Sequence, residues 1–455
     1  MIRRGISLIL LGFFAVGTLT QSGQVVAAFE NTTNLKNSTP IEHFVFLMQE
    51  NHTFDNYFGT YPGADGFPAG TKMPIDPKNP NSGYVEPWHI GSSTITDLSH
   101  SASTFRDQFN DGKMDGFVSA LNKRNQDGRL AMGYYDDREI PYYWNLADNY
   151  VLFDRLFSSA KDGSFSNHMF SIAAIPAEKK PGEELSNYLA TKQTIFDRLQ
   201  AAGVSWKVYV QNYDPTITYR NLDVSGNRAS QVIWVPLLNF NRFIEDPELS
   251  SHIVNLNEYY QDLKNDTLPA VSYIVPSGAS EHPPGNLETG QRFVKTLIQE
   301  LMRSSSWNSS AFMFAYDDWG GWYDHVNPPK VDEFGYGPRV PGLLISPYAK
   351  KGFIDHTELD FTSVLKFIET NWGVDPLTER DANANNLLTA FDFQSSPRAP
   401  QFLPLTRETA IETVKSPARN IYLTYGFGSV FAIGSVVFAS LRSKKKAENS
   451  QTSEH

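Results

Sequence analysis

Three short segments of the chain combine acidic, amide and histidine side chains that could do chemistry together. They are Gln49-Glu50-Asn51-His52, Ser280-Glu281-His282-Pro283-Pro284 and Asp317-Asp318-Trp319-Gly320-Gly321. Carboxylate and amide oxygens, with no thiolate beside them, suit a hard or borderline divalent cation. Such an ion could polarise a phosphoryl oxygen and lower the pKa of a hydroxyl nucleophile. We therefore expect one or more divalent metal ions, whose identity the sequence does not specify.

The two adjacent aspartates set a geometric condition on this site. Neighbouring side chains on a strand point to opposite faces, so Asp317 and Asp318 can reach one ion only where the strand ends and the chain turns. Gly320-Gly321 permits such a turn. By itself, an Asp-Asp pair is more often a solvated loop than a metal site.

A fourth segment, Gly163-Ser164-Phe165-Ser166-Asn167-His168, precedes the apolar run 169–174. A serine at the start of a helix lies near unpaired backbone amides, which stabilise an anion or a developing negative charge. Ser164 is therefore a candidate nucleophile. The alternative is a plain helix N-cap, which the local sequence alone favours.

Each of the first three segments follows a short apolar run, and such runs alternate with helical patterns along the chain. This alternation predicts an α/β fold built on parallel strands. Ligands of such sheets bind beyond the carboxyl ends of the strands, where these segments would lie. The candidate strands are 44–48, 204–210, 271–275, 311–316 and 342–345, the candidate helices are 194–202, 289–303 and 361–372, and 62–95 is a candidate loop or insertion.

Composition excludes several classes of protein. The chain has 455 residues, 40% of them hydrophobic, which suits one large α/β domain or two ordinary ones. A net charge of −11 without a basic patch argues against nucleic acid as a partner. The absence of cysteine excludes disulfides, thiolate metal sites and a cysteine nucleophile.

Both ends of the sequence carry membrane-related signals. Residues 1–28 combine two arginines, an apolar run and small residues, which predicts a signal peptide, with an uncleaved N-terminal anchor as the alternative. Residues 420–441 are uncharged and long enough to span a bilayer, with a buried core helix as the alternative. The tail 442–455 begins with a basic cluster, and such flanks stay in the cytoplasm. We expect a single-pass protein of the cell membrane whose body, 41–404, lies outside and joins the membrane helix through a linker at 405–419.

The four segments belong to a longer ordered series of motifs that spans Ile41 to about Gly373. The series consists of Glu50-Asn51-His52-Thr53-Phe54-Asp55-Asn56-Tyr57-Phe58-Gly59, His100 with Asp111-Gly112-Lys113-Met114-Asp115-Gly116-Phe117, 163–168, 281–284, 317–321 and Tyr323-Asp324-His325-Val326 with Pro328-Pro329. In this order the motifs resemble the bacterial phospholipase C and acid phosphatase type phosphoesterases.

The resemblance implies an alkaline-phosphatase-like α/β sandwich with a central, mostly parallel sheet flanked by helices. It also implies hydrolysis of phosphate esters through a phosphorylated hydroxyl, with Ser164 as the nucleophile. His100 and His282 would grip the phosphate or protonate the leaving group. The implied metal ligands are Glu50, Asn51, Asp317 and Asp318. The residues expected at the phosphate are Asn167, His168, Glu281, Lys113 and His325.

The chain departs from the common family pattern at two positions. Thr usually stands where Ser164 is, and because both hydroxyls can attack, this changes little. Pro usually stands where Ser166 is, so a rigid turn is lost and a second candidate hydroxyl appears.

Three functions remain open at this point. A phospholipase C would cleave the phosphodiester of a phospholipid, whereas an acid phosphatase would act on phosphomonoesters. An apolar rim around the site would favour lipid, and Trp319, Trp322 and Tyr323 are its candidates, with core packing as the alternative. The third possibility is an inactive surface-binding protein on the same fold, although none of the expected carboxylates is missing.

Overall fold

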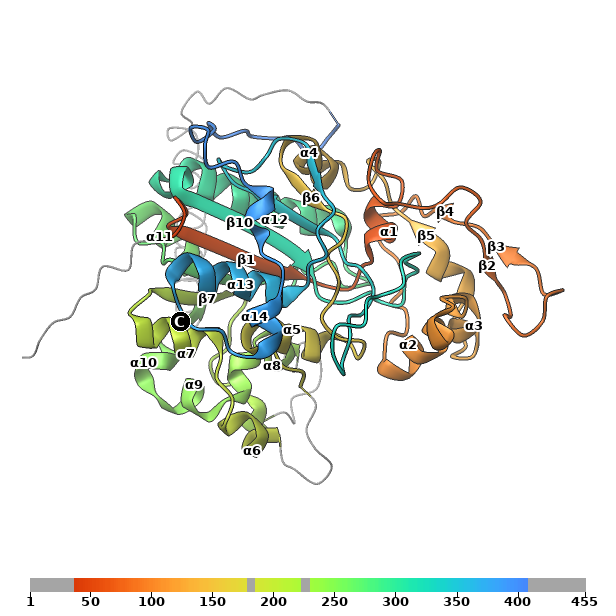
Figure 1. The fold of residues 1–455 in the computed structure, drawn as a ribbon, viewed down its shortest axis with the longest axis horizontal. Helices are drawn as coiled ribbons and strands as arrows, with labels where there is room; N and C mark the ends of the chain where they lie inside the picture. Colours follow the sequence, from red (N-terminus) through yellow and green to blue (C-terminus); the bar gives the residue numbers. More distant parts are fainter. Residues whose placement is uncertain (1–36, 178–184, 222–229, 408–455) are drawn as a thin grey trace, which may run out of the picture. The chain divides into compact units, whose positions relative to one another are not determined.

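The structure of the chain is a computed structural model that describes residues 37–177, 185–221 and 230–407. An eight-stranded sheet with the order β12-β6-β11-β10-β1-β9-β7-β8 forms its centre (Figure 1). The strands of this sheet are β1 (His43–Gln49), β6 (Val151–Phe153), β7 (Trp206–Val210), β8 (Ile253–Asn255), β9 (Val271–Val275), β10 (Ser310–Tyr316), β11 (Gly342–Ile345) and β12 (Phe353–Asp355).

The sheet is mostly parallel, as expected, with one strand reversed. β11 runs antiparallel to both of its neighbours, β10 and β6, whereas every other pairing in the sheet is parallel. All five predicted strands are present within one or two residues at each end. They were visible in the sequence because strands covered on both faces read as continuous apolar runs.

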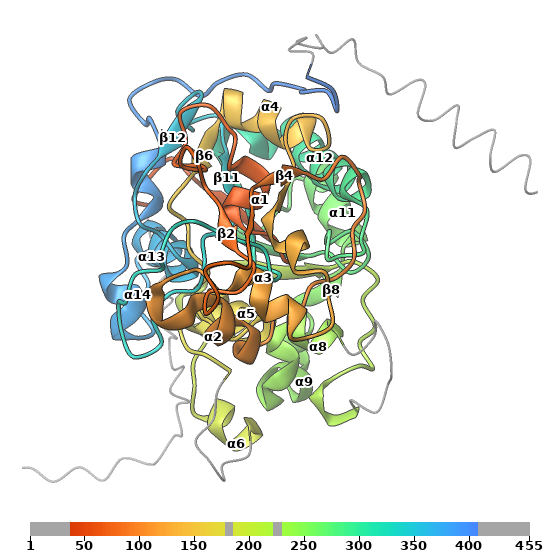
Figure 2. The ribbon, with the colours of Figure 1, turned by 90° about the vertical axis from the view of Figure 1, so that its right-hand side faces the viewer.

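Helices cover both faces of this sheet (Figure 1 and Figure 2). One group contains α4 (Pro141–Asn149), α11 (Asn257–Asn265) and α12 (Leu287–Arg303), and the other contains α5 (Ser164–Ala173), α7 (Ile195–Ala202) and α13 (Phe361–Trp372). The remaining helices are α1 (Phe54–Phe58), α2 (Ala102–Phe109), α3 (Phe117–Asn122), α6 (Leu185–Ala190), α8 (Ser230–Trp234), α9 (Asn241–Glu245), α10 (Pro247–Ser250) and α14 (Glu379–Asn383). The expected α/β architecture is confirmed.

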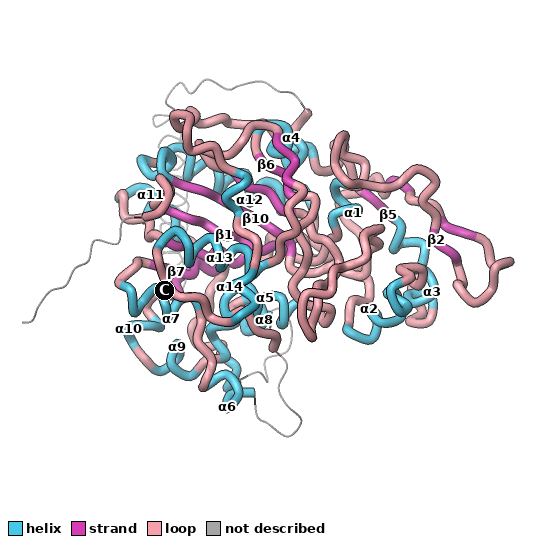
Figure 3. Tube along the Cα trace, viewed as in Figure 1, coloured by secondary structure: helices cyan, strands magenta, loops and turns pink. Residues whose placement is uncertain are grey.

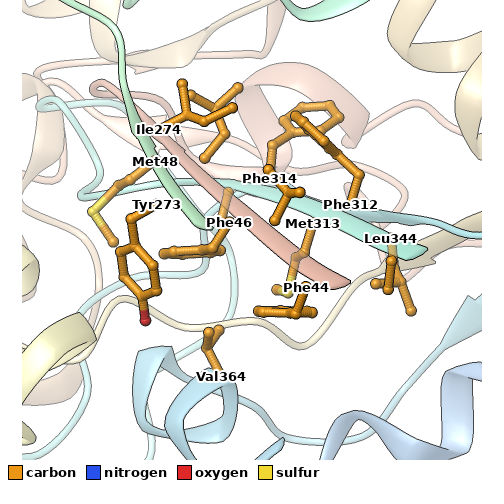
Figure 4. Close-up of a cluster of buried hydrophobic side chains, with 14 of the residues drawn as sticks. Phe44, Phe46, Met48, Tyr273, Ile274, Phe312, Met313, Phe314, Leu344 and Val364 are labelled. Carbon is orange, nitrogen blue, oxygen red and sulfur yellow. The ribbon is translucent and has the colours of Figure 1, made fainter. Parts of the chain in front are cut away.

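Side chains alternate between the two faces along the central strands, and this alternation builds the core (Figure 4). Phe44 points toward α13, where its ring lies 5.0 Å from that of Phe367. Phe314 points to the other face and lies 5.2 Å from the ring of Tyr143 on α4. Burying a side chain of this size stabilises the folded state by roughly 1.5–3 kcal/mol. The closely packed sheet therefore provides a rigid base for the site.

The predicted helix ends agree with the capping residues. Thr194 caps α7 in a capping box with Asp197. Gly203 and Gly373 end α7 and α13 in the left-handed conformation. α12 starts at Leu287, two residues before its predicted start, because Asn286 accepts a hydrogen bond from the backbone of Thr289 and caps the helix there.

The predicted insertion at 62–95 is mostly loop, with short strand pairs (Figure 3). β2 (Met73–Pro74) pairs with β3 (Tyr84–Val85) inside this segment, and β4 (Trp88–His89) pairs with β5 (Gly133–Tyr134), which lies outside it. The segment shares a second hydrophobic core with α2 and α3, and Trp319 and Trp322 are fully buried in it. The interpretation of these two tryptophans as an exposed rim is therefore wrong, because both side chains are buried in this core.

No helix among the described residues is both long and apolar enough to cross a membrane. The predicted signal peptide (1–28), membrane helix (420–441) and tail (442–455) lie outside the described residues, as does the linker from residue 408 onward.

Candidate active site

Two neighbouring strands deliver the four predicted metal ligands to one edge of the sheet. β1 and β10 pair in parallel with Gln49 opposite Tyr316, so the residues that follow leave the sheet side by side. The backbone N–H of Asn51 donates to Asp317 Oδ1 at 3.1 Å. Gly320, at φ +57°, is the predicted turn, and a Cβ there would lie 2.2 Å from the carbonyl oxygen of Asn51. A glycine is needed at this position because the two strand ends approach so closely.

Ser164 lies directly against these carboxylates. Its hydroxyl is 3.2 Å from Asp318 Oδ2 and 3.5 Å from Glu50 Oε2. It is the first residue of α5, whereas the N-cap is Gly163 at φ +93°, and no side chain caps the helix. The alternative interpretation of Ser164 as an N-cap is therefore wrong.

The other candidate hydroxyl in this segment is already engaged. Ser166 donates to Asp162 Oδ2 at 2.7 Å and accepts from the backbone N–H of Ala177 at 3.2 Å. At the position where the family pattern has a proline, Ser166 thus connects residues on either side of α5. The structure thus gives Ser166 a supporting position and leaves Ser164 facing the carboxylates.

The three carboxylates concentrate negative charge in a buried place. Glu50, Asp317 and Asp318 are each no more than 1% exposed. Burial, followed by repulsion from Asp317 and Asp318, raises the pKa of Glu50 well above its ordinary value. Burial and Asp318 raise the pKa of Asp317 to about 6, and burial raises that of Asp318. The arrangement is therefore consistent with a site for a divalent cation, which would compensate this charge.

The side-chain amide of Asn51 lies between two histidines and two carboxylates. Its nitrogen lies 3.0 Å from Nε2 of both His100 and His282. In each ring Nδ1 faces a carbonyl oxygen, that of Leu98 at 2.6 Å and that of Pro283 at 2.8 Å, so Nδ1 must donate. Nε2 is then an acceptor in the neutral ring, and the amide of Asn51 donates to both histidines.

This orientation leaves the amide oxygen of Asn51 among other oxygens. It lies 3.1 Å from Glu50 Oε2 and 2.9 Å from Asp317 Oδ1. An octahedral ion with bonds of about 2.1 Å separates neighbouring ligand oxygens by roughly 3.0 Å, so the spacing fits a bound cation. Turned over, the amide would donate to both carboxylates, but its oxygen would then need two protonated histidines. Asp317 Oδ2 is also buried without a hydrogen-bond partner among the described residues, so this oxygen is available to ligate a cation.

Two residues of α5 support this cluster. His168 Nε2 lies 2.9 Å from Glu50 Oε1, and burial lowers the pKa of His168 to about 4, so the neutral ring donates to the carboxylate. Asn167 accepts from the N–H of Ala160 at 2.8 Å and donates to the carbonyl of Gly163 at 3.0 Å. Both side chains thus hold the groups around Ser164.

Three residues predicted at the phosphate do not join the cluster. The carboxylate of Glu281 accepts hydrogen bonds from three buried tyrosines. His325 bonds instead to Asp55 at 2.7 Å, beside the buried Arg339. Lys113 is exposed, and in the described part of the chain no hydrogen bond or ion pair joins it to the cluster.

Two cavities flank the pair formed by His100 and His282. The first, of about 450 Å³, is lined by Ser164 and His100, and the second, of about 530 Å³, is lined by Glu281 and His282. The short helix α8 contributes to both, since Ile233 lines the first and Trp234 the second. Ile233 is 37% exposed, so the site has an apolar border other than the one expected at Trp319.

Sequence reasoning missed α8 and the tyrosines around Glu281. Nothing in the local sequence of α8 indicates that it borders the site. Its role depends on a long-range contact, because α8 is more than sixty residues from Ser164 in the chain. Tyr316 did carry a signal in the sequence. It directly precedes Asp317 at the end of a strand, so its side chain points to the face opposite that of Asp317.

Comparison with known proteins shows the family of the chain. The model of the Phosphoesterase family matches residues 41–375. The chain is 27% identical over 445 residues to the non-hemolytic phospholipase C of Pseudomonas aeruginosa, covering 84% of this chain and 61% of that one. It is 28% identical over 424 residues to phospholipase C B of Mycobacterium tuberculosis, covering 79% of each.

Among solved structures, the chain is similar to a protein in the alkaline phosphatase superfamily from Vibrio parahaemolyticus. The two share 12% identity with a TM-score of 0.38, over 77% of this chain and 72% of the other. Because the family model covers the sheet and every residue of the cluster, the chain belongs to the Phosphoesterase family, whose members are phosphoric ester hydrolases.

Proposed function

We propose that this protein is a metal-dependent phosphoric ester hydrolase of the phospholipase C type that works through a phosphoserine intermediate. The observation that carries the proposal is the position of Ser164, whose hydroxyl lies 3.2 Å from Asp318 and 3.5 Å from Glu50. A serine hydroxyl is a weak nucleophile unless a base or a metal ion activates it. Here the hydroxyl faces buried carboxylates that would share a cation with it.

The residues that would hold the cation are Glu50, Asn51, Asp317 and Asp318. When bound, a divalent ion would neutralise charge on a phosphoryl oxygen and lower the pKa of the serine hydroxyl. His168, through its bond to Glu50, would keep one ligand in place.

The chain's own residues can then carry out two displacements at phosphorus. In the first, Ser164 Oγ forms a bond to phosphorus while the bond to the leaving alcohol breaks. In the second, water attacks the phosphoserine and Ser164 is released. His100 and His282, with Nε2 atoms that converge on Asn51, lie where they can bind phosphoryl oxygens and give a proton to the leaving oxygen.

His100 can take up the proton that this role requires. Burial alone would lower its pKa, but Asp318, the Leu98 carbonyl, Asp97 and Asp317 act against burial, and the pKa lies above its ordinary value. A protonated ring can donate to a phosphoryl oxygen or to the departing oxygen.

The cavities favour a phosphodiester over a phosphomonoester. A diester carries substituents on two sides of phosphorus, and a separate cavity lies beside each histidine. The relatives in Pseudomonas and Mycobacterium are both named as phospholipases C, which supports a phospholipid substrate for this chain. Ile233 and Trp234 offer apolar contacts at the border of the site.

The proposal also includes a location. The signal-like residues 1–28 and the apolar residues 420–441 support a single-pass protein of the cell membrane with the catalytic body outside. A site beside a membrane would meet phospholipid directly.

The deciding experiment compares two substrates with one preparation of the full chain. Phosphatidylcholine in mixed micelles and p-nitrophenyl phosphate would be assayed before and after chelation, with the metal content measured in parallel. We expect higher kcat/KM for the lipid and loss of activity on chelation. Preference for the monoester would make the protein an acid phosphatase, and inactivity on both with metal bound would favour a binding protein.

A further inference from the structure

Glu281 is a buried acid beside the site whose side-chain hydrogen bonds in the described residues all come from tyrosines. It is 2% exposed. Tyr57 and Tyr316 donate to Oε2 at 2.7 and 2.6 Å, and Tyr143 donates to Oε1. With all three bonds directed to tyrosines, the carboxylate has turned away from Ser164.

The three tyrosines come from three different elements. Tyr57 belongs to α1, Tyr143 to α4, and Tyr316 is the last residue of β10, directly before Asp317. Glu281 itself lies in the segment after β9. One carboxylate therefore connects the segments that follow β1, β9 and β10 at the reactive edge of the sheet.

The backbone of Glu281 adopts an unfavourable conformation that its surroundings must maintain. Its φ of +66° lies in the left-handed region, which a residue with a Cβ adopts at a cost. Its backbone carbonyl lies 3.4 Å from His52 Nε2. α12 carries a glycine, Gly290, where the side chain passes, and a Cβ there would lie 2.0 Å from Glu281 Oε1. The neighbouring elements thus make room for the carboxylate and keep the strained residue in place.

The residues on either side of Glu281 belong to the reactive cluster. The carbonyl of Ser280 accepts from the N–H of Glu50 at 2.9 Å. His282 follows, and its Nε2 lies 3.0 Å from the amide of Asn51. A rotation of the backbone at Glu281 would therefore move His282 relative to Asn51.

We propose that Glu281 is a positioning residue, which uses its three tyrosine bonds to fix the left-handed turn that aims His282 at the reacting phosphoryl group. This inference rests on the proposed function for the step that His282 performs. It assigns Glu281 no contact with the phosphate. The three tyrosine hydroxyls donate the hydrogen bonds that hold this turn in place.

The test is Glu281→Gln, which keeps the size of the side chain and removes its charge. Displacing a catalytic group by a fraction of an ångström costs roughly 10–100-fold in rate. We expect kcat on the preferred ester to fall by this factor while KM changes less than about two-fold. A phosphate contact would instead raise KM, and an unchanged kcat would overturn the proposal.

A double-mutant cycle separates positioning from general destabilisation. If Glu281 acts through His282, Glu281→Gln should have no further effect on the residual rate of His282→Ala. An equal loss in both backgrounds would overturn the proposal. The matched control is Glu369→Gln, another buried glutamate, which lies on α13 and has no hydrogen bond or ion pair to the cluster in the described residues. It should leave kcat unchanged.

Two further measurements keep the inference testable. If Glu281→Gln does not fold, Tyr57→Phe provides a milder test because it removes a single hydrogen-bond donor. We expect this variant also to lower kcat, and an unchanged kcat would overturn the proposal. NMR of the His282 imidazole reads the turn without any turnover. If the wild type hydrolyses no ester, the proposed function fails, yet a changed His282 signal in Glu281→Gln still supports the positioning role, and an unchanged signal refutes it.

Discussion

Replacing Ser164 with Ala separates catalysis from folding, and both magnitudes follow from its contacts. The hydroxyl makes no capping bond, and its contact with Asp318 at 3.2 Å is worth about 0.5–1.5 kcal/mol. Asp318 keeps its bond from the N–H of Gly320 at 2.8 Å. The free energy of unfolding should therefore fall by about 1 kcal/mol, whereas loss of the attacking group should lower kcat by at least about 10⁴-fold.

Ser166→Ala is the matched control, because it should show the reverse pattern. Its hydroxyl is buried and makes two hydrogen bonds, so removal should cost about 1–3 kcal/mol of stability and leave kcat within a few-fold. The assay is denaturant unfolding beside steady-state kinetics, with acid quench of labelled substrate and fragmentation of the labelled peptide. Near-normal turnover in Ser164→Ala, or label on Ser166, would refute the assignment.

Three further outcomes are expected. Asp317→Ala should lower the bound metal and the activity together, as measured by elemental analysis and kinetics, and full occupancy would remove Asp317 from the ligand set. Burial, followed by the neighbouring Asp381, raises the pKa of Glu369 to about 9. Glu369 therefore binds its proton more tightly in the folded state than in the unfolded state. The stability that this gives is fully present below pH 4.5 and is lost as the pH rises toward 9. Thermal unfolding of Glu369→Gln should lack that part of the pH dependence, and parallel curves would show that Glu369 titrates normally. Protease added to intact cells should release an active fragment cut before residue 420, and release from permeabilised cells alone would reverse the proposed orientation.

Local sequence was sufficient wherever one physical effect dominated. β1 and β10 could be located because strands buried on both faces are continuously apolar. The turn after Asp318 could be anticipated because Gly320 and Gly321 tolerate positive φ. In both places the neighbours along the chain determine the outcome.

Long-range contacts decided the positions that sequence could not. Trp319 is an aromatic residue beside the site, but α2 packs against it: the ring of Phe105 lies 5.3 Å away, and the indole N–H donates to Gln108 at 2.7 Å. His325 stands in a motif that resembles a site block, yet Asp55, from 270 positions away in the chain, holds it in another network. A pattern of residue types gives no information about which distant partner a side chain reaches.

The same long-range geometry links reactivity to stability at the site. β6 runs parallel to β10 because the reversed strand β11 lies between them, so the segment that leads from β6 to Ser164 starts at the edge where Glu50 and Asp317 emerge. Folding therefore brings together carboxylates that are far apart in the unfolded chain, and burial, followed by their mutual repulsion, raises their pKa values. A cation that binds them only in the folded state removes that repulsion and must stabilise the fold by the free energy of its binding. In the proposed mechanism, the charge that would prepare Ser164 for attack is for this reason also a charge that would make the metal-free protein less stable.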